Sequence, residues 1–344
     1  MKIVADNQIP YLAEPLARVA QVVTIDGEGI TPREVRDADV LIVRTRTRCD
    51  SRLLEGSSVR IICTATIGYD HIDMEWCKAH GIEVITAAGC NSRAVLQYVS
   101  AVLALHLSRC ATEPQQMTLG VVGVGNVGRL VADYARSWGF RVLCSDPPRE
   151  EAEGLGREEG FVPLDELLAE SDIVTLHPLL SRDGNHPTYH LIGSKELALL
   201  RPRAALINAS RGEVVDSDAL LDVLSTKHLA CYLDVWEGEP NKIDQRLVRQ
   251  AIISTFHIAG YSLQGKANAS SIVVRALSER LGLPFTEWFP IEVKPSQPRP
   301  IEWEQMCAEI ENYCTLEEID AKLKAQPQNF ERFRKNYALR KEFF

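Results

Sequence analysis

Three polar residues, Arg211, Glu239 and His257, follow predicted strands at or just beyond the point where each strand ends. The strands are the apolar segments 205–208, 231–235 and 252–254. Ligands of an open parallel sheet bind beyond the carboxyl ends of its strands, so we expect these side chains at one edge. Taken singly, each also has a structural explanation: a salt-bridged Arg, a solvated loop Glu or a core His.

Together the three side chains fit the oxidation of a 2-hydroxy acid, which removes a hydroxyl proton and a hydride from C2. A His side chain is the usual base near neutral pH, which suits His257. A carboxylate such as Glu239 beside the imidazole orients it and stabilises its protonated form. An Arg such as Arg211 binds the substrate carboxylate and polarises the oxygen at C2. The sequence therefore predicts Arg211, Glu239 and His257 as the catalytic set.

A glycine-rich turn in the middle of the chain indicates the hydride acceptor. Residues 118–128 read TLGVVGVGNVG, a strand that runs into G-x-G-x-x-G and then a helix. Gly123 permits the tight turn, Gly125 lets the backbone approach a pyrophosphate, and Gly128 allows close packing of helix and strand. Free N–H groups at the helix N-terminus, around Asn126 and Val127, favour phosphate. The alternative is a tight turn that binds no ligand.

Asp146 ends the next predicted strand, 141–146, eighteen positions after Gly128. A carboxylate at this place accepts hydrogen bonds from the adenosine ribose hydroxyls. It also repels a 2′-phosphate. The sequence therefore predicts NAD rather than NADP as the cofactor.

Short apolar strands alternate with helical stretches in two series, which predicts α/β architecture with two parallel sheets covered by helices. The first series has strands at 2–5, 21–25, 40–43, 60–64 and 83–86, and the second at 119–122, 142–145, 173–176, 205–208, 231–235 and 252–254. The apolar segment 94–107 predicts a buried helix between them, and a further helix is expected over 262–281. Prolines from 284 to 300 indicate a linker or edge-strand region. The helical residues from about 301 are too few for a core of their own, so docking on another subunit is expected.

Composition excludes several classes of function. The 344 residues carry a net charge of −9, which gives no support to nucleic-acid or membrane-surface binding. No apolar run long enough to span a membrane is present. Nine cysteines without a C-x-x-C pair favour reduced thiols in the cytoplasm. His186 and His190 have metal-like spacing, but Gly184 and Pro187 argue against a helix there, so no metal is predicted.

Several motifs resemble the D-2-hydroxyacid dehydrogenase family. They are the glycine-rich turn, Asn208-Ala209-Ser210-Arg211-Gly212, Asp234-Val235 with Glu239-Pro240, and His257-Ile258-Ala259-Gly260. The resemblance implies a Rossmann-like cofactor domain inserted into a flavodoxin-like substrate domain. The expected boundaries are 1–95 and 258–282 for the substrate domain, 96–257 for the NAD-binding domain, and 283–344 for a small C-terminal dimerisation domain. The catalytic Arg, Glu and His of the family map onto Arg211, Glu239 and His257.

Further segments resemble the members of this family that oxidise 4-phospho-D-erythronate to 3-hydroxy-2-oxo-4-phosphobutanoate in pyridoxal 5′-phosphate synthesis, as homodimers. The segments are 6–11, 64–71, 88–91, 236–240, 257–266 and 333–337. The resemblance implies substrate contacts at Thr45, Thr66 and Tyr261. It implies NAD contacts at Asp146, Thr175, Ala209, Ser210, Arg211, Asp234 and Gly260. Thr45 stands where Ser is usual, and Gln264 replaces an expected Glu.

A phosphorylated acid has two anionic ends, of which Arg211 serves one. Arg44 and Arg46, just after the strand 40–43, are predicted to hold the phosphate. An extended chain would put both on one face and Thr45 on the other, so a site shared with Thr45 requires the chain to turn. Arg334 or Lys335 of a partner subunit is a further candidate. The alternative is a solvated basic loop.

Two other functions fit the same scaffold. One is a broader D-2-hydroxyacid dehydrogenase that acts on 3-phosphoglycerate or glyoxylate. The other is a non-catalytic binding protein that senses NAD. The fold alone cannot separate these functions.

Overall fold

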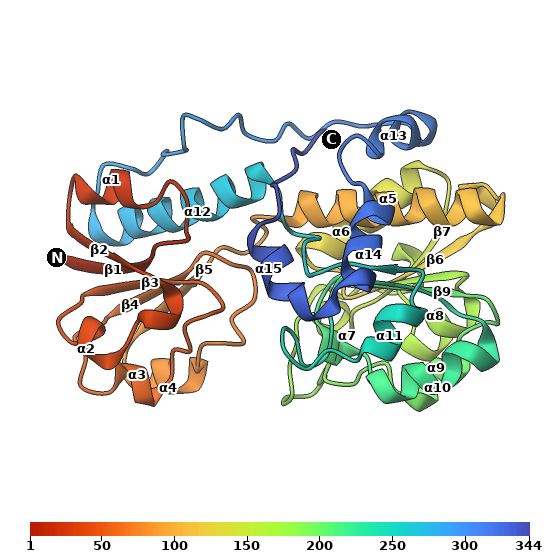
Figure 1. Cartoon of the computed structure of the whole chain (residues 1–344), viewed down its shortest axis with the longest axis horizontal. Coiled ribbons are helices and arrows are strands. Elements are labelled where there is room, and N and C mark those ends of the chain that lie inside the picture. The colour runs from red at the N-terminus through yellow and green to blue at the C-terminus, as the bar shows by residue number, and fades with distance from the viewer. The chain divides into compact units, whose positions relative to one another are not determined.

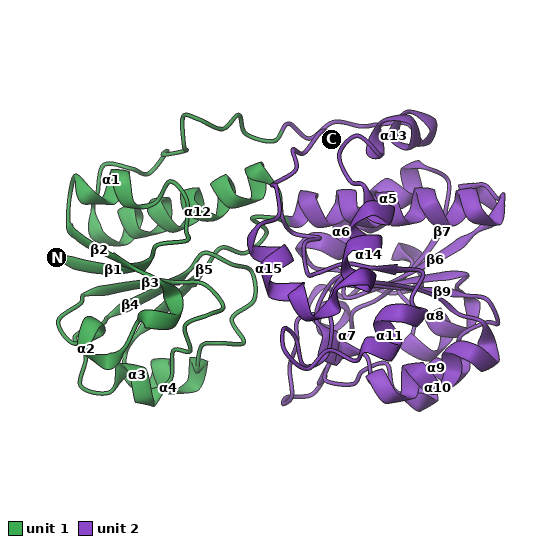
Figure 2. Ribbon diagram, in the orientation of Figure 1, with its two compact units in different colours: residues 1–91, 262–296 green, residues 92–261, 297–344 purple.

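The computed structural model describes residues 1–344 and divides into two compact units (Figure 1, Figure 2). Unit 1 comprises residues 1–91 and 262–296, and unit 2 comprises residues 92–261 and 297–344. Unit 2 thus interrupts the sequence of unit 1. Residues 297–344, which the sequence analysis assigns to a separate C-terminal domain, group with unit 2.

Unit 1 is built on a parallel five-stranded sheet with the order β2-β1-β3-β4-β5. This is the flavodoxin-like order, as predicted. The central strands β3 and β4 are apolar and wholly buried, as expected where helices cover both faces of a sheet. The strands are β1 (Lys2–Asp6), β2 (Gln21–Ile25), β3 (Val40–Val43), β4 (Ile61–Thr64) and β5 (Glu83–Thr86).

Helices cover both faces of this sheet, and each face has its own core (Figure 1). One face packs against α1 (Ala13–Ala17) and α12 (Leu263–Leu281), and the other against α2 (Pro32–Val35), α3 (Ser51–Leu54) and α4 (Met74–Ala79). The short 3-10 helix η1 (Gly27–Gly29) follows β2. The long helix α12 begins where the Ser262 side chain accepts from the Gly265 amide at 2.8 Å, and it ends at Gly282 with a φ of 65°.

Unit 2 contains a parallel six-stranded sheet with the order β11-β10-β9-β8-β6-β7. A parallel bridge between Cys144 and Phe161 adds one more strand position beside β7. Numbered along the chain, the order from that edge is then 3-2-1-4-5-6-7, which is the Rossmann order 3-2-1-4-5-6, as predicted, followed by β11. The strands are β6 (Thr118–Val122), β7 (Arg141–Ser145), β8 (Ile173–Leu176), β9 (Ala205–Asn208), β10 (Ala230–Leu233) and β11 (Ile253–Ser254).

The helices of unit 2 surround this sheet. The first, α5, is buried over much of its length, as the apolar segment 94–107 predicts. The helices of the inserted segment are α5 (Ser92–Cys110), α6 (Asn126–Ser137), α7 (Pro147–Glu153), α8 (Leu164–Glu170), α9 (Ser194–Leu199), α10 (Ser217–Lys227) and α11 (Gln245–Gln250). Short 3-10 helices are η2 (Pro114–Gln116), η3 (Arg157–Glu159), η4 (Gly212–Val214) and, near the C-terminus, η5 (Pro327–Asn329).

The C-terminal helices α13 (Trp303–Ile310), α14 (Leu316–Ala325) and α15 (Phe330–Lys335) share the core of unit 2. The Asp320 carboxylate on α14 accepts from the amide of Ser254 at 2.7 Å, so this helix covers the edge strand β11. Residues 283–300, where prolines are dense, contain no helix or strand. No helix of the protein is long and apolar enough to cross a membrane.

Candidate active site

The glycine-rich turn joins β6 to α6 with the geometry that a pyrophosphate requires. Gly123 has a φ of 80°, and a Cβ there would lie 2.5 Å from the backbone nitrogen of Pro178. A Cβ on Gly128 would lie 2.0 Å from the Gly123 oxygen, so helix and turn are in close contact. A Cβ on Gly125 would meet no atom within 4 Å. The helix N-terminus has no side-chain cap, so its amides are available to an anion. These residues fit a dinucleotide.

Asp146 follows β7 directly and lies against the glycine-rich turn. One carboxylate oxygen, Oδ2, accepts from the Val124 amide at 2.7 Å, and the other accepts from the Arg149 amide at 3.2 Å. Arg149 donates from Nη1 to the Val124 oxygen at 2.9 Å, and its Nε is paired with Glu153. The negative charge of Asp146 is therefore held beside the turn.

Thr175, which is buried at the end of β8, and His177, which is partly buried, form a pair next to this turn. The Thr175 hydroxyl and the His177 Nε2 are 2.9 Å apart. Burial lowers the pKa of His177 to about 3, so its imidazole is neutral. The following residue, Pro178, lies against Gly123.

Arg211 is positioned by a hydrogen-bonded loop that follows β9. The Asn208 side chain donates to the Arg211 carbonyl at 2.9 Å and accepts from the Ser210 amide at 3.1 Å. A Cβ on Gly212 would lie 2.0 Å from the carbonyl carbon of Trp236, so the loops after β9 and β10 touch. Arg211 and Glu239 therefore come from loops in direct contact.

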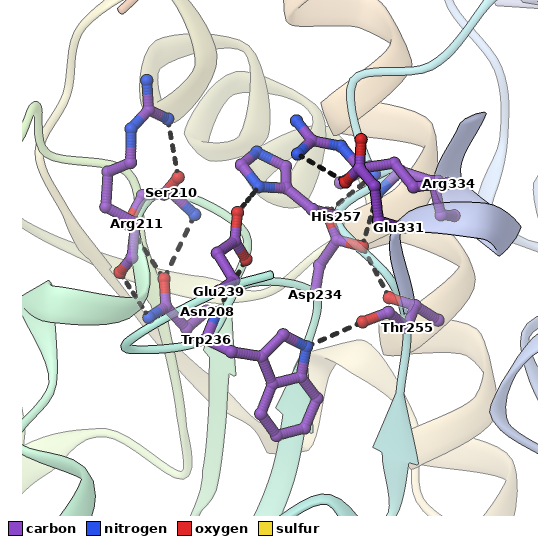
Figure 3. A network of polar contacts seen from close by, with 12 residues as sticks. Asn208, Ser210, Arg211, Asp234, Trp236, Glu239, Thr255, His257, Glu331 and Arg334 are labelled. Carbon is purple, nitrogen blue, oxygen red and sulfur yellow. Dashed lines mark hydrogen bonds and ion pairs between the residues drawn. The ribbon is translucent and has the colours of Figure 1, made fainter. Parts of the chain in front are cut away.

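Glu239 and His257 form the ion pair that the sequence predicts (Figure 3). Glu239 Oε1 is hydrogen-bonded to His257 Nδ1, and Oε2 accepts from the Trp236 amide at 3.1 Å. Burial raises the pKa of the Glu239 carboxyl, but the charge of His257 and its hydrogen bond lower it, and the net pKa is below the usual value. Glu239 is thus ionised at neutral pH. The bond at Nδ1 leaves Nε2 of His257 to act on a substrate.

Asp234 lies directly behind this pair at the end of β10. Its side chain is fully buried, and its carboxylate accepts from the Thr255 hydroxyl at 2.6 Å and from the amides of Ile258 and Ala259. A carboxylate has about four acceptor positions, so one remains for a further partner. Gly260 follows these amides in the same loop, before Tyr261.

Arg334, on α15, also belongs to this cluster, within the same chain (Figure 3). Its Nε donates to the Tyr261 hydroxyl at 3.1 Å, its side chain is 14% exposed, and its charge contributes to lowering the pKa of Glu239. From the sequence, Arg334 is expected only as a residue of a partner subunit. The signal in the sequence is the segment 333–337, but α15 lies in a part of the chain whose packing the sequence does not reveal.

The predicted substrate residues of unit 1 gather after β3 and β4. The chain turns at Thr45 and Arg46, where the Thr47 amide bonds to the Arg44 carbonyl at 3.3 Å, so the condition for a site shared with Thr45 is met. Arg44 itself pairs through Nε with the buried carboxylate of Asp6 at 2.9 Å. The Thr66 hydroxyl lies 2.7 Å from that of Thr64.

His186 and His190 lie in the helix-free segment between β8 and α9. His186 pairs with Glu151 and His190 with Glu237, each at 2.9 Å. The structure contains no group of three or more His, Cys, Asp and Glu side chains that could hold a metal ion.

The chain is similar to known dehydrogenases over most of its length. Residues 92–259 match the family model of the D-isomer specific 2-hydroxyacid dehydrogenase NAD-binding domain. An erythronate-4-phosphate dehydrogenase of Bacteroides fragilis is 42% identical over 355 aligned residues, which cover 99% of this chain and 97% of that protein. The erythronate-4-phosphate dehydrogenase of Marinobacter nauticus is 46% identical over 286 residues, covering 83% of this chain and 74% of that protein.

Among solved structures, the D-lactate dehydrogenase of Aquifex aeolicus in complex with NAD and lactic acid is similar. It has a TM-score of 0.67 and 25% identity, and the match covers 86% of this chain and all of that chain. The NAD-dependent formate dehydrogenase of Staphylococcus aureus in complex with NAD also has a TM-score of 0.67 and 25% identity, with the same coverage. The chain belongs to the erythronate-4-phosphate dehydrogenase family of the D-isomer-specific 2-hydroxyacid dehydrogenases, and its inserted segment is their NAD-binding domain.

Proposed function

We propose that this protein oxidises 4-phospho-D-erythronate at its C2 hydroxyl with NAD, giving 3-hydroxy-2-oxo-4-phosphobutanoate for pyridoxal 5′-phosphate synthesis. The Glu239–His257 pair carries the proposal, because a binding protein that only senses NAD has no use for an oriented base. Relatives that bear the name of this activity align with nearly the whole chain.

The residues of unit 2 divide the reaction between them. His257 takes the hydroxyl proton at Nε2, while Glu239 at Nδ1 stabilises the imidazolium that forms. Arg211 binds the substrate carboxylate and polarises the oxygen at C2. NAD, when bound, accepts the hydride from C2.

The cofactor contacts in this proposal follow the carboxyl edge of the sheet in unit 2. The glycine-rich turn holds the pyrophosphate through Gly123, Gly125, Asn126, Val127 and Gly128, and Asp146 holds the adenosine ribose. The remaining contacts are Thr175, Ala209, Ser210, Arg211, Asp234 and Gly260. Because the Asp234 carboxylate already accepts three hydrogen bonds, it has one acceptor position to offer the cofactor.

Substrate contacts are proposed at Thr45, Thr66 and Tyr261, with the phosphate held by Arg44 and Arg46. Asp6 pairs with Arg44 and holds its guanidinium in place at this turn. In unit 2, Arg334 is a second guanidinium beside Tyr261 and takes the role that we first considered for a partner subunit.

The protein is further proposed to be a cytoplasmic homodimer that uses residues 283–344 as its dimerisation region. All nine cysteines are free thiols, which suits a reducing compartment. Light scattering on the full chain measures the oligomeric state directly. A monomer at micromolar concentration would contradict the dimer.

Turnover of a panel of acids with NAD tests the proposed reaction. The panel contains 4-phospho-D-erythronate, D-erythronate, 3-phospho-D-glycerate and, in the reverse direction with NADH, glyoxylate. We expect the highest kcat/KM with 4-phospho-D-erythronate. Higher efficiency with 3-phosphoglycerate or glyoxylate would favour the broader dehydrogenase, and NAD binding without any turnover would favour the sensing protein.

A further inference from the structure

The loop that follows β11 carries the catalytic base in an unusual backbone conformation. We call residues 257–261 the His257 loop. His257 has a φ of 57°, in the left-handed region that residues with a Cβ seldom adopt. Such a conformation is strained and persists only where the surroundings fix it. The contacts that fix this loop therefore control where the imidazole points.

Asp234 holds the N–H side of the His257 loop. Its backbone oxygen accepts from the His257 amide at 2.7 Å. Its carboxylate accepts from the amides of Ile258 at 2.8 Å and Ala259 at 2.7 Å. Three consecutive amides of the loop are thus bonded to one buried residue.

Arg340 holds the carbonyl side of the same loop. This residue follows α15 in the C-terminal tail and is only 6% exposed. Its Nη1 donates to the Ile258 carbonyl at 2.8 Å, and its Nη2 donates to the Ala259 carbonyl. The Nη2 group also donates to the carbonyl of Ala94, in the first turn of α5, at 2.8 Å. One guanidinium therefore joins the His257 loop to α5.

Both segments lie where the chain enters or leaves unit 2. Ala94 comes just after the boundary between residues 91 and 92, and Ala259 comes just before the boundary between 261 and 262. Segments that lead out of a compact unit have fewer covalent and packing restraints on one side. A buried guanidinium that bonds to both gives each a fixed position in unit 2.

Charge and packing keep Arg340 in place. A buried guanidinium is costly unless it is paired and hydrogen-bonded. Burial lowers the pKa of Arg340, but nearby groups, Asp234 among them, raise it, and the net pKa is raised. Farther along the tail, the backbone oxygen of Phe344 accepts from Arg93 at 3.2 Å and from Gln97 at 3.4 Å. The tail is thus anchored beyond Arg340 as well.

We propose that Arg340 is a positioning residue for proton transfer: it fixes the His257 loop from the carbonyl side, opposite Asp234, so that the imidazole stays on Glu239. The inference rests on the proposed dehydrogenase function. A Lys at this position would keep the charge but lose the planar fork that reaches three carbonyls. The C-terminal tail thereby becomes part of the catalytic apparatus.

The test compares Arg340→Lys and Arg340→Met with the full-length wild-type protein. We expect kcat per NADH-binding site to fall about 10- to 100-fold in both variants, because a displacement of about 1 Å at a reacting group costs rates of this order. Hydrogen–deuterium exchange of residues 257–261 is expected to accelerate, while exchange of the glycine-rich turn stays unchanged. Exchange is measured without substrate, so it reports on the loop itself.

Two matched controls separate positioning from general stability. Lys341→Met removes a charge from the next, exposed position and is expected to leave kcat and exchange unchanged. Leu323→Ala creates a cavity under α14, where Leu323 is fully buried, and is expected to lower Tm but keep kcat within about twofold well below that Tm. If Arg340→Met does not fold, Arg340→Lys carries the comparison.

Unchanged kcat and unchanged loop exchange in Arg340→Lys would overturn the proposal. An equal loss of kcat in Leu323→Ala would also overturn it, since the effect would then follow stability alone. If the wild-type protein turns over none of the acids, the proposed function fails, but loop exchange in the variants still shows whether Arg340 fixes the loop.

Discussion

Both sheets are parallel, but the polar residues at their carboxyl edges are held in different ways. In unit 2, the edge residues Asn208, Asp234 and Glu239 are tied into their loops by hydrogen bonds and are largely buried. In unit 1, the turn after β3 exposes Thr45 to solvent, while Arg44 pairs with Asp6 and the Thr47 hydroxyl donates to the Gly27 carbonyl. Groups that handle protons and hydride need fixed positions, whereas groups that recognise a charged end of a substrate tolerate solvent.

The difference also concerns charge. In unit 2, Glu239 is ionised and faces His257, with Arg334 nearby. Replacing Glu239 or His257 therefore changes the electrostatic environment of the side chain that remains. In unit 1, the basic turn is partly exposed, so solvent screens its charges more than it screens the Glu239–His257 pair. We therefore expect losses in unit 2 to appear in kcat, and losses in unit 1 to appear in the choice of substrate.

The largest effect is expected for the base in unit 2. His257→Ala should lower kcat by about 10²- to 10⁴-fold, the usual cost of losing a general base. NAD affinity, measured by the fluorescence of bound NADH, should stay nearly the same. His190→Ala, which removes an imidazole paired with Glu237, is the control and should keep its activity. Turnover close to that of the wild type in His257→Ala would show that another group takes the proton.

In unit 1, Arg46→Ala should reduce the preference for phosphorylated over unphosphorylated erythronate by about 10- to 100-fold, since a charge-assisted phosphate contact is worth about 1.5–3 kcal/mol. Arg44→Ala should also reduce this preference, and because it removes the ion pair of the buried Asp6 carboxylate it should lower Tm. The measurement is the ratio of kcat/KM for the two substrates.

Arg48→Ala is the control for this turn, because Arg48 is highly exposed and pairs only with Asp50. It should keep the preference of the wild type. If the preference survives in the Arg44 and Arg46 variants, the phosphate is bound elsewhere, and Arg334→Ala is the next variant to measure.

Much of the fold follows from pattern. The eleven strands lie within two residues of the segments expected from apolar runs, because parallel strands buried on both faces are continuously apolar. The packing of α13, α14 and α15 on unit 2 could not be predicted in this way. These helices are amphipathic, and the apolar face of a helix does not show which surface of the protein it packs against.

The site was predictable where chemistry constrains residue type and spacing. The glycine-rich turn and the Glu239–His257 pair belong to this class. Arg334 and Arg340 could not be placed at the site in this way, since each comes from the tail, more than seventy residues after the loop that it contacts. The pairing of Arg44 with Asp6 joins two strands whose neighbourhood depends on the order of the sheet.

The choice between NAD and NADP tests a second role of a fixed carboxylate in unit 2, because Asp146 is expected to repel the 2′-phosphate of NADP. The wild-type protein should prefer NAD over NADP by at least about tenfold in kcat/KM, since a 2′-phosphate would face this carboxylate. Asp146→Asn should reduce the preference for NAD over NADP. Arg149 lies next to Asp146 but is paired with Glu153 through Nε and Nη2, so it does not offset the repulsion. Equal efficiency with the two cofactors in the wild type would refute this role of Asp146.

The smallest expected effect is a shift of the kcat–pH profile, and it tests the Glu239–His257 pair directly. Burial raises the pKa of Glu239, but the charge and hydrogen bond of His257, the charge of Arg334 and the Trp236 amide together lower it below the usual value, so Glu239 carries its charge at neutral pH. That charge favours the protonated imidazole. Glu239→Gln keeps the shape of the side chain but removes the charge that stabilises a positive imidazole beside it.

Oxidation requires neutral His257, so the acidic limb of the kcat–pH profile should move to lower pH in Glu239→Gln. The profile is measured in both proteins between about pH 5 and 9. Glu237→Gln is the matched control, because Glu237 is two positions away and pairs with His190 instead. If the acidic limb stays in place in Glu239→Gln, or moves equally in Glu237→Gln, then the charge of Glu239 does not act on the base, and its role is limited to the hydrogen bond that orients the imidazole.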